Sequence, residues 1–127
     1  MKVYLVEDHE SMRIILKRLL RRNFPGISVV GESASAETAL EEIPVFKPNL
    51  VLVDISLPGM DGIEMVRRLK SCYPDLCILV VTGQEVDIYR QSALEAGAHD
   101  IISKDDDAPL LESIAALQPK HTISGND

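Results

Sequence analysis

The chain has 127 residues, 46% of them hydrophobic, which suits one domain with a core of its own and leaves little room for a second. Its formal net charge of −7 at pH 7 argues against nucleic-acid binding by this domain, because neutralising phosphates requires clustered Lys and Arg. No apolar run approaches the roughly 20 residues of a membrane span, and the first residues do not resemble a secretory signal, so we expect no membrane association and a cytoplasmic location.

Apolar runs alternate with helical periodicity along the whole chain, and this alternation predicts five strands and five helices. We expect strands at residues 3–6, 27–31, 50–53, 76–81 and 99–103. We expect helices at residues 11–24, 35–46, 62–72, 86–96 and 108–117. Ser35 is a candidate N-cap of the second helix, and Pro44 is a candidate early end of it. Gly97 is expected to stop the fourth helix, and Asp106 or Asp107 to cap the fifth.

The predicted strands are continuously apolar instead of alternating, which indicates that helices cover both faces of the sheet. With a helix between successive strands, the pattern predicts an α/β domain built on a five-stranded parallel sheet that is doubly wound. We assign this domain to residues 1–117. Residues 118–127 are mostly polar and contain Pro and Gly, and we expect them to form a flexible C-terminal tail.

Polar and charged residues follow four of the five predicted strands. Ligands of doubly wound sheets bind at the carboxyl ends of the strands, so side chains placed there converge on one edge. Any one of these residues would be unremarkable at a strand end, but their joint placement is specific. In chain order the residues are Glu7, Asp8, Asp54, Thr82, Gly83 and Lys104.

The grouped carboxylates predict a metal-assisted phosphoryl acceptor. Neighbouring carboxylates repel one another unless a cation lies among them, and oxygen ligands suit Mg²⁺ or Mn²⁺. Asp54 is then a candidate nucleophile, because carboxylates form aspartyl phosphates. Lys104 would neutralise charge, Thr82 would donate a hydrogen bond to a phosphoryl oxygen, and Gly83 would leave the approach open. His9 follows the acidic pair, but we do not expect it to bind a metal that prefers oxygen.

Four segments carry a resemblance to a known family: LVEDH at 5–9, LVLVDISLPGMDG at 50–62, LVVTG at 79–83 and ALEAGAHDIISKD at 93–105. From about residue 2 to residue 117 the chain resembles the response regulator receiver domain, the phosphoacceptor module of two-component signalling. The resemblance implies a flavodoxin-like fold with strand order 2-1-3-4-5. The residues of these segments are most similar to those of receivers that precede a helix-turn-helix DNA-binding domain. Because only a short tail follows residue 117, we expect either a stand-alone receiver or a domain excised from a longer regulator.

The resemblance also implies a role for residues around the acidic edge. Asp54 matches the phosphorylated aspartate of the family. Glu7 and Asp8 match the acidic pair that holds Mg²⁺, together with Asp54 and the backbone carbonyl of Ser56. The side chains of Ser56 and Gln84 lie two residues beyond the phosphoacceptor and the switch threonine, and they are expected to tune the lifetime of the phosphoryl group.

The switch that the resemblance implies has one departure from the family pattern. Thr82 matches the switch hydroxyl and Lys104 matches the family's lysine. Three residues before this lysine the family usually has Tyr or Phe, and here the position is Ile101. Either Thr82 moves without an aromatic partner, or Tyr89 of the fourth predicted helix substitutes for it.

Partners follow from the same resemblance. A sensor histidine kinase or a phosphotransfer protein would donate the phosphoryl group, with Ile14, Ile15 and Arg18 of the first helix as its docking surface. The alternative is that these are ordinary exposed apolar residues beside a solvated basic face. The family often forms homodimers through its fourth helix, fifth strand and fifth helix, and core packing is again the alternative. The residues in question there are Ile88, Tyr89 and Ile101.

Three other functions compete with the phosphoacceptor hypothesis. A haloacid-dehalogenase-type phosphatase also forms an aspartyl phosphate, but it places a second Asp where this chain has Ser56. A flavodoxin-like cofactor domain requires a phosphate-binding loop after the first strand, and the acidic residues 7–10 would repel a phosphate. A degenerate receiver that acts without phosphorylation is disfavoured by the complete site, although Ile101 keeps it open.

Overall fold

The computed structural model describes residues 1–118, and within them five strands and five helices alternate along the chain, as predicted. The strands are β1 (Lys2–Val6), β2 (Ser28–Ser33), β3 (Leu50–Val53), β4 (Cys77–Thr82) and β5 (Asp100–Ser103). The helices are α1 (Glu10–Asn23), α2 (Ala36–Phe46), α3 (Gly62–Cys72), α4 (Val86–Ala96) and α5 (Asp107–Leu117). The predicted ends differ from these bounds by at most two residues.

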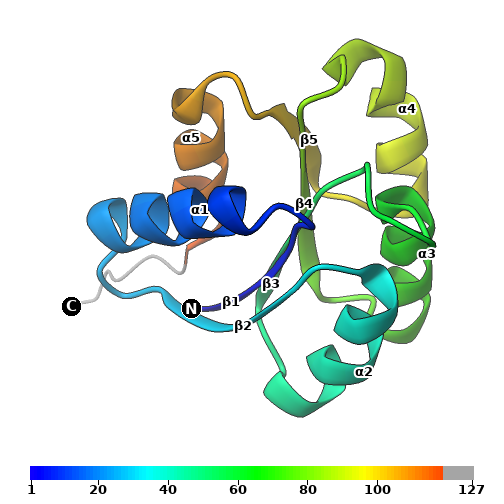
Figure 1. Cartoon of the computed structure of the whole chain (residues 1–127), viewed down its shortest axis with the longest axis horizontal. Helices are drawn as coiled ribbons and strands as arrows, with labels where there is room; N and C mark the ends of the chain where they lie inside the picture. Colours follow the sequence, from blue (N-terminus) through cyan, green and yellow to red (C-terminus); the bar gives the residue numbers. More distant parts are fainter. Residues whose placement is uncertain (119–127) are drawn as a thin grey trace.

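The five strands form one parallel sheet in the order β2-β1-β3-β4-β5 (Figure 1). This is the flavodoxin-like order that the family resemblance implied. Val6 of β1 is paired with Val53 of β3, and Val53 with Val80 of β4. The residues that follow β1 and β3 therefore leave the sheet side by side, which places Glu7 next to Asp54.

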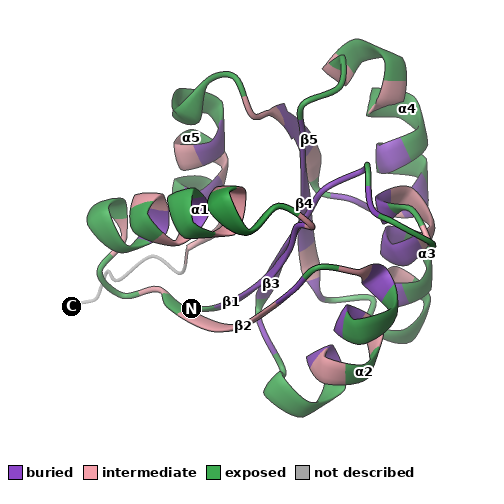
Figure 2. Cartoon of the chain, viewed as in Figure 1, coloured by how far each residue is buried: buried purple, intermediate pink, exposed green. Residues whose placement is uncertain are grey.

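Helices cover both faces of the sheet, and α1 and α5 lie on the face opposite α2, α3 and α4 (Figure 1). Side chains alternate between the faces along each strand. In β5, Ile101 faces α3 and α4, and Ile102 faces α1 and α5. Figure 2 shows the result: β1, β3 and β4 are mostly buried between helices that are exposed on their outer sides, and the edge strand β2 is mostly half-buried.

Several helix boundaries that the sequence predicted coincide with caps. Ser35 caps α2, since its hydroxyl accepts a hydrogen bond from the backbone N–H of Thr38, and Asp106 caps α5 in the same way. Gly97 ends α4 with a φ of 113°, a conformation that suits glycine. The possible early end of α2 at Pro44 is wrong, because the helix continues to Phe46 with the proline on its exposed side.

Residues 119–127, which make up all but the first residue of the predicted tail, lie outside the described residues. Among residues 1–118, no helix combines the length and the hydropathy needed to cross a membrane.

Candidate functional site

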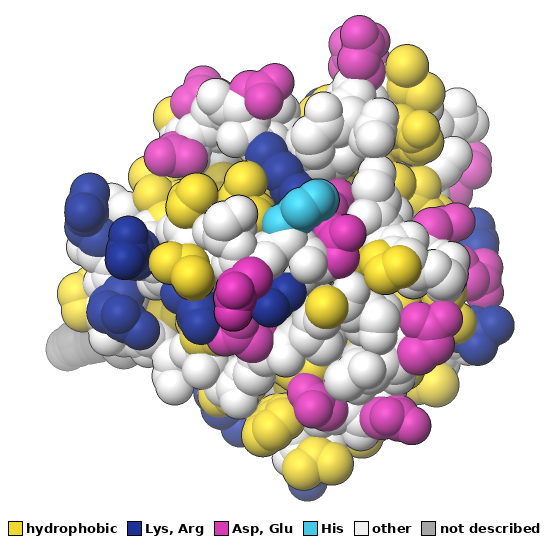
Figure 3. Space-filling view, viewed as in Figure 1, with side chains coloured by type: hydrophobic (Ala, Val, Ile, Leu, Met, Phe, Trp, Pro, Cys, Tyr) yellow, Lys and Arg dark blue, Asp and Glu magenta, His cyan; other side chains and the backbone are white. Residues whose placement is uncertain are grey.

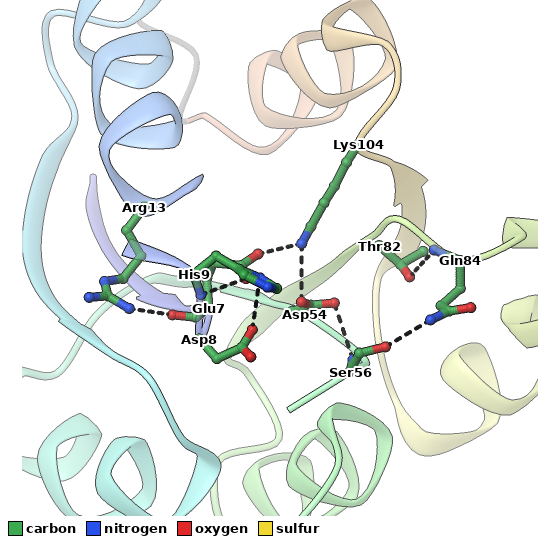
Figure 4. A network of polar contacts seen from close by, with 9 residues as sticks. All are labelled: Glu7, Asp8, His9, Arg13, Asp54, Ser56, Thr82, Gln84 and Lys104. Carbon is green, nitrogen blue, oxygen red and sulfur yellow. Dashed lines mark hydrogen bonds and ion pairs between the residues drawn. The ribbon is translucent and has the colours of Figure 1, made fainter. Parts of the chain in front are cut away.

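The carboxyl ends of four strands bring the predicted site residues together, as Figure 4 shows. Glu7 and Asp8 follow β1 directly, and Asp54 is the first residue after β3. Thr82 is the last residue of β4, and Lys104 follows the last residue of β5. Convergence of these side chains is therefore a direct consequence of parallel pairing, because each chain segment leaves the sheet at the same edge.

Lys104 joins the two most deeply buried carboxylates of the site. Its Nζ donates hydrogen bonds to the carboxylate of Glu7 and, over 3.0 Å, to Oδ2 of Asp54. The side chains of Glu7 and Asp54 are 2% and 4% exposed, and that of Lys104 is 13% exposed. Burial lowers the pKa of Lys104, but its hydrogen bonds to Glu7 and Asp54 outweigh this and raise the pKa above the ordinary value. Lys104 therefore keeps its charge at neutral pH and balances part of the negative charge.

One carboxylate oxygen of Asp8 is unsatisfied. Its Oδ1 is buried and accepts no hydrogen bond from residues 1–118, a rare and costly state for a carboxylate oxygen. His9 Nδ1 lies 3.1 Å from this oxygen and 3.0 Å from Oε2 of Glu7, and only the second contact has hydrogen-bond geometry. The orphaned oxygen marks a place where a positive charge would be stabilised.

The same group of residues fits a divalent cation. Glu7, Asp8, His9 and Asp54 each have a potential ligand atom, and these four atoms all lie within 4.8 Å of one another. Three of the four groups are carboxylates, and oxygen is what Mg²⁺ and Mn²⁺ prefer. The exclusion of His9 as a ligand stays a prediction, although its ring lies against the acidic pair. The part assigned to the Ser56 carbonyl also stays a prediction.

A chain of hydrogen bonds links the loops that follow β3 and β4 (Figure 4). The backbone N–H of Gln84 donates to Oγ1 of Thr82 over 2.9 Å, and the Gln84 side-chain amide donates to Oγ of Ser56 over 3.1 Å. The backbone N–H of Ser56 donates in turn to Oδ1 of Asp54 over 3.2 Å. The two residues predicted to flank the phosphoryl group are thus bonded to each other across the site.

Glycines shape the loops around Asp54 in different ways. A Cβ on Gly62 would lie 2.1 Å from the backbone oxygen of Asp54, so only glycine fits without displacing Asp54. Gly59 has a φ of 72°, a left-handed backbone conformation that suits glycine. Gly83 is exposed and a Cβ there would meet nothing within 4 Å, so packing does not require glycine at this position.

Two contributors to the site were missed in the sequence. Gly62 was recognised only as the start of a helix, although the GMDG spacing offered a signal. By its spacing Arg13 falls outside the apolar stripe of the first predicted helix, yet its Nη1 donates to the backbone carbonyl of Glu7 over 2.6 Å. Helical periodicity gave no signal for that contact, because it depends on how α1 is oriented against the end of β1.

The residues predicted for docking and dimerisation divide into two groups. Ile14, Ile15 and Arg18 of α1 are exposed, as a docking surface would require. Ile88 of α4 is 67% exposed, whereas Ile101 is 2% exposed and belongs to the core beneath α3 and α4. Of the two alternatives left open for Ile101, core packing is therefore the one that holds, since its strand directs the side chain inward. Tyr89 is half-buried against the same core.

A family model described as the response regulator receiver domain matches residues 3–115. Among curated relatives, the response regulator GacA of Pseudomonas syringae pv. syringae is 34% identical over 117 residues, which cover 92% of this chain and 53% of the relative. The DNA-binding transcriptional activator DevR/DosR of Mycobacterium tuberculosis is 39% identical over 104 residues, which cover 82% of this chain and 48% of the relative. The chain thus spans about half the length of these relatives.

Solved structures agree with this result. A two-component response regulator of the LuxR family from Aurantimonas sp. SI85-9A1 has a TM-score of 0.86 and 34% identity, covering 91% of this chain and 83% of its own. The signal receiver domain of the putative response regulator NarL from Mycobacterium tuberculosis has a TM-score of 0.82 and 26% identity, covering 91% and 93%. The similarity therefore extends over nearly the whole described chain.

Proposed function

Because the chain belongs to the response regulator receiver domain family, we propose that it is the phosphoacceptor of a two-component phosphorelay, with Asp54 as the phosphorylated residue. One observation carries the proposal: the buried carboxylate of Asp54 lies between Lys104 and an acidic pair that includes an orphaned oxygen. A carboxylate buried at that cost is better explained by chemistry than by stability.

The reaction that fits this geometry is phosphoryl transfer from a phosphohistidine. An oxygen of Asp54 attacks phosphorus, the new O–P bond forms as the P–N bond breaks, and the electron pair of that bond stays on the donor imidazole. Lys104 is within reach of the charge on the transferred group, since it already contacts Oδ2 of Asp54 at 3.0 Å. Such a transfer depends mainly on positioning and charge neutralisation, which these residues supply.

Glu7, Asp8 and Asp54 would hold a divalent cation, Mg²⁺ or Mn²⁺, with the Ser56 carbonyl as a further ligand. When bound, the cation supplies charge neutralisation for the transferred phosphoryl oxygens. The protein residues provide the rest. Lys104 keeps its proton at neutral pH, and the Ser56 N–H holds Oδ1 of Asp54 in place. The chain is in this sense a signalling receiver that catalyses only its own phosphorylation and dephosphorylation.

The signal is proposed to leave the site through the loop that follows β4. Thr82 Oγ1 is held by the Gln84 N–H, and a phosphoryl oxygen at Asp54 would compete for the threonine hydroxyl. Movement of Thr82 would shift α4 against its neighbours and change the α4-β5-α5 surface. Ile101 fills the core here, so the switch would work through Thr82 and Lys104 without an exposed aromatic residue. The Ser56–Gln84 pair would tune the phosphoryl lifetime.

The proposed phosphodonor is a sensor histidine kinase or a phosphotransfer protein, which would dock on Ile14, Ile15 and Arg18. A second copy of this chain would form a homodimer through the α4-β5-α5 surface, with Ile88 in the contact. The relative DevR/DosR is described as a DNA-binding transcriptional activator, and the chain spans only about half the length of both DevR/DosR and GacA. We therefore assign any DNA contact to a separate domain, and residues 1–117 to the receiver. A cytoplasmic location rests on the family relationship alone.

The test is phosphorylation by a small donor. Wild-type protein is incubated with Mg²⁺ and acetyl phosphate, and intact mass is measured; beryllofluoride with amide NMR shifts serves as a second readout. We expect one phosphoryl adduct on wild type and none on Asp54→Asn. Asp100→Asn is the matched control, because Asp100 lies in β5 with its carboxylate half-exposed and paired to Arg90. An adduct that survives in Asp54→Asn, or none in wild type, contradicts the proposal.

A further inference from the structure

Arg13 holds the backbone on both sides of Asp8. Its side-chain Nη1 donates to the carbonyl of Glu7 over 2.6 Å, which Figure 4 shows. Its own backbone N–H donates to the carbonyl of His9 over 3.1 Å, as the first hydrogen bond of α1. The two acceptors flank Asp8 directly, so one residue ties the short acidic turn to the start of the helix.

The charge of Arg13 is balanced away from the acidic site. Its Nε donates to Oε1 of Glu32 over 2.9 Å, and Lys17 pairs with the other oxygen of the same carboxylate. Glu32 belongs to β2, the strand beside β1. The hydrogen bond from Lys17, together with that from Arg13, lowers the pKa of Glu32, so this carboxylate is ionised at neutral pH. The Arg13 side chain is only 15% exposed, which fits a fixed position.

Arg13 and Lys104 act on Glu7 in opposite ways. Lys104 donates to the Glu7 carboxylate, the group that would also bind a cation. Arg13 contacts the backbone carbonyl, and among the described hydrogen bonds its side chain has Glu7 and Glu32 as partners and no carboxylate of the acidic site. Arg13 can therefore fix the turn without competing for the cation.

We propose that Arg13 is a positioning residue for the divalent-cation site, holding Glu7 and Asp8 in a metal-binding arrangement through the Glu7 carbonyl while Glu32 neutralises its charge. The inference rests on the proposed function, since it concerns the same site. Residues that orient metal ligands without touching the metal commonly change affinity by about 10- to 100-fold. No repositioning energy is then needed when the cation binds.

Whether replacing Arg13 strengthens or weakens cation binding separates a positioning role from a purely electrostatic one. Removing a positive charge near a cation site strengthens cation binding if only charge matters. Removing a positioning residue weakens it. Lys17 is a matched control, because it shares the partner Glu32 and the charge of Arg13 but, among its described hydrogen bonds, contacts only Glu32.

The experiment measures Mn²⁺ affinity by electron paramagnetic resonance for wild type, Arg13→Ala and Lys17→Ala, with far-UV circular dichroism to verify folding. We expect Arg13→Ala to bind Mn²⁺ about tenfold more weakly, and Lys17→Ala to bind it as tightly as wild type or more tightly. Should Arg13→Ala fail to fold, Arg13→Lys is measured against the same criterion, because lysine cannot reproduce both contacts of the guanidinium.

Two outcomes overturn the inference: Mn²⁺ affinity in the Arg13 variant that is unchanged or higher, or an equal loss in the Lys17 variant. Both leave the proposed function intact, because wild-type Mn²⁺ binding and the phosphoryl adduct on Asp54 are measured separately. A wild-type protein that neither binds Mn²⁺ nor accepts phosphate contradicts the proposed function itself, and the inference with it.

Discussion

The two edges of the sheet differ sharply in what they bury. At the carboxyl edge, Glu7 and Asp54 are almost fully buried and share one lysine. At the amino edge lies a groove of about 690 Å³ whose walls include Ile43, Pro44 and Leu76. Figure 3, viewed from the same side as Figure 1, shows charged side chains of both signs and His beside the carboxyl ends of the strands. The groove at the amino edge is thus lined mainly by apolar residues, whereas charged side chains gather at the carboxyl edge.

We propose from this difference that the carboxyl edge is the functional one. Burying charges costs free energy that mutual attraction only partly restores, so an apolar replacement is often as stable. The apolar lining of the amino edge needs no such explanation, because packing alone favours it. Buried, perturbed groups identify the functional edge more reliably than hollow volume does. Three variants of decreasing effect, and one pH profile, test this contrast.

The largest effect is expected for Lys104→Met at the carboxyl edge. The substitution leaves Glu7 and Asp54 without their shared cation, which should lower the free energy of unfolding by about 3–5 kcal/mol. Urea unfolding with and without Mg²⁺ measures this loss in the free energy of unfolding. Because the unpaired carboxylates favour a cation, Mg²⁺ should stabilise the variant more than it stabilises wild type. The rate of phosphorylation by acetyl phosphate should fall by about 10²-fold or more.

If Lys104→Met were as stable as wild type, the two carboxylates would not depend on the lysine, and the contrast between the edges would lose its main support. Lys70→Met is a suitable control, because that lysine donates to the backbone carbonyls of Pro74 and Leu76 near the amino edge. We expect it to leave both phosphorylation and the response to Mg²⁺ unchanged.

The second variant is Ile43→Ala, which enlarges the hollow at the amino edge. Ile43 is buried and packs in the core beneath α2, so its truncation should lower the free energy of unfolding by about 3 kcal/mol. Thermal or urea unfolding measures the loss. Mn²⁺ affinity and the phosphoryl adduct should stay as in wild type, and a change in either would mean that the edges are coupled.

The third variant, Gly62→Ala, tests the close approach of α3 to the nucleophile. Its Cβ would lie 2.1 Å from the Asp54 backbone oxygen, so we expect a loss of about 1–3 kcal/mol in the free energy of unfolding together with slower phosphorylation. Gly26→Ala is the matched control, because a Cβ there meets nothing within 4 Å. It should change stability by less than about 0.5 kcal/mol.

Much of the carboxyl edge could be predicted from the sequence because it depends on backbone rules. Parallel strands share one edge, so a carboxylate after β1 and another after β3 must be neighbours once the strand order is known. The resemblance supplied that order, and the register of Val6 and Val53 confirms it. The roles of individual side chains at the edge stay predictions.

Side-chain contacts that depend on how a helix is oriented against the sheet could not be predicted from the sequence. Arg13 has the spacing of a solvent-facing residue, and only the docking of α1 aims it at the Glu7 carbonyl. The burial of Ile101 was within reach of the sequence, because alternation along a covered strand sends Ile101 and Ile102 to opposite cores. Core packing was the alternative to a dimer surface that the sequence left open for Ile101, and the structure confirms it.

The smallest expected effect concerns Glu32, whose pKa lies below its ordinary value of 4.5 through its hydrogen bonds with Lys17 and Arg13. A carboxylate with a lowered folded-state pKa contributes stability that is fully present above 4.5 and is lost as the pH falls through the lowered value. The pair is partly exposed, so Glu32→Gln should cost less than about 1 kcal/mol at pH 7.

Urea unfolding at several pH values should show this difference vanish in acid and shrink in high salt. The cost of Ile43→Ala should depend on neither, since an apolar contact carries no proton or counterion. A Glu32 difference that stays constant down to the lowest pH would place its contribution in packing, and the two edges would then differ less than their charges indicate.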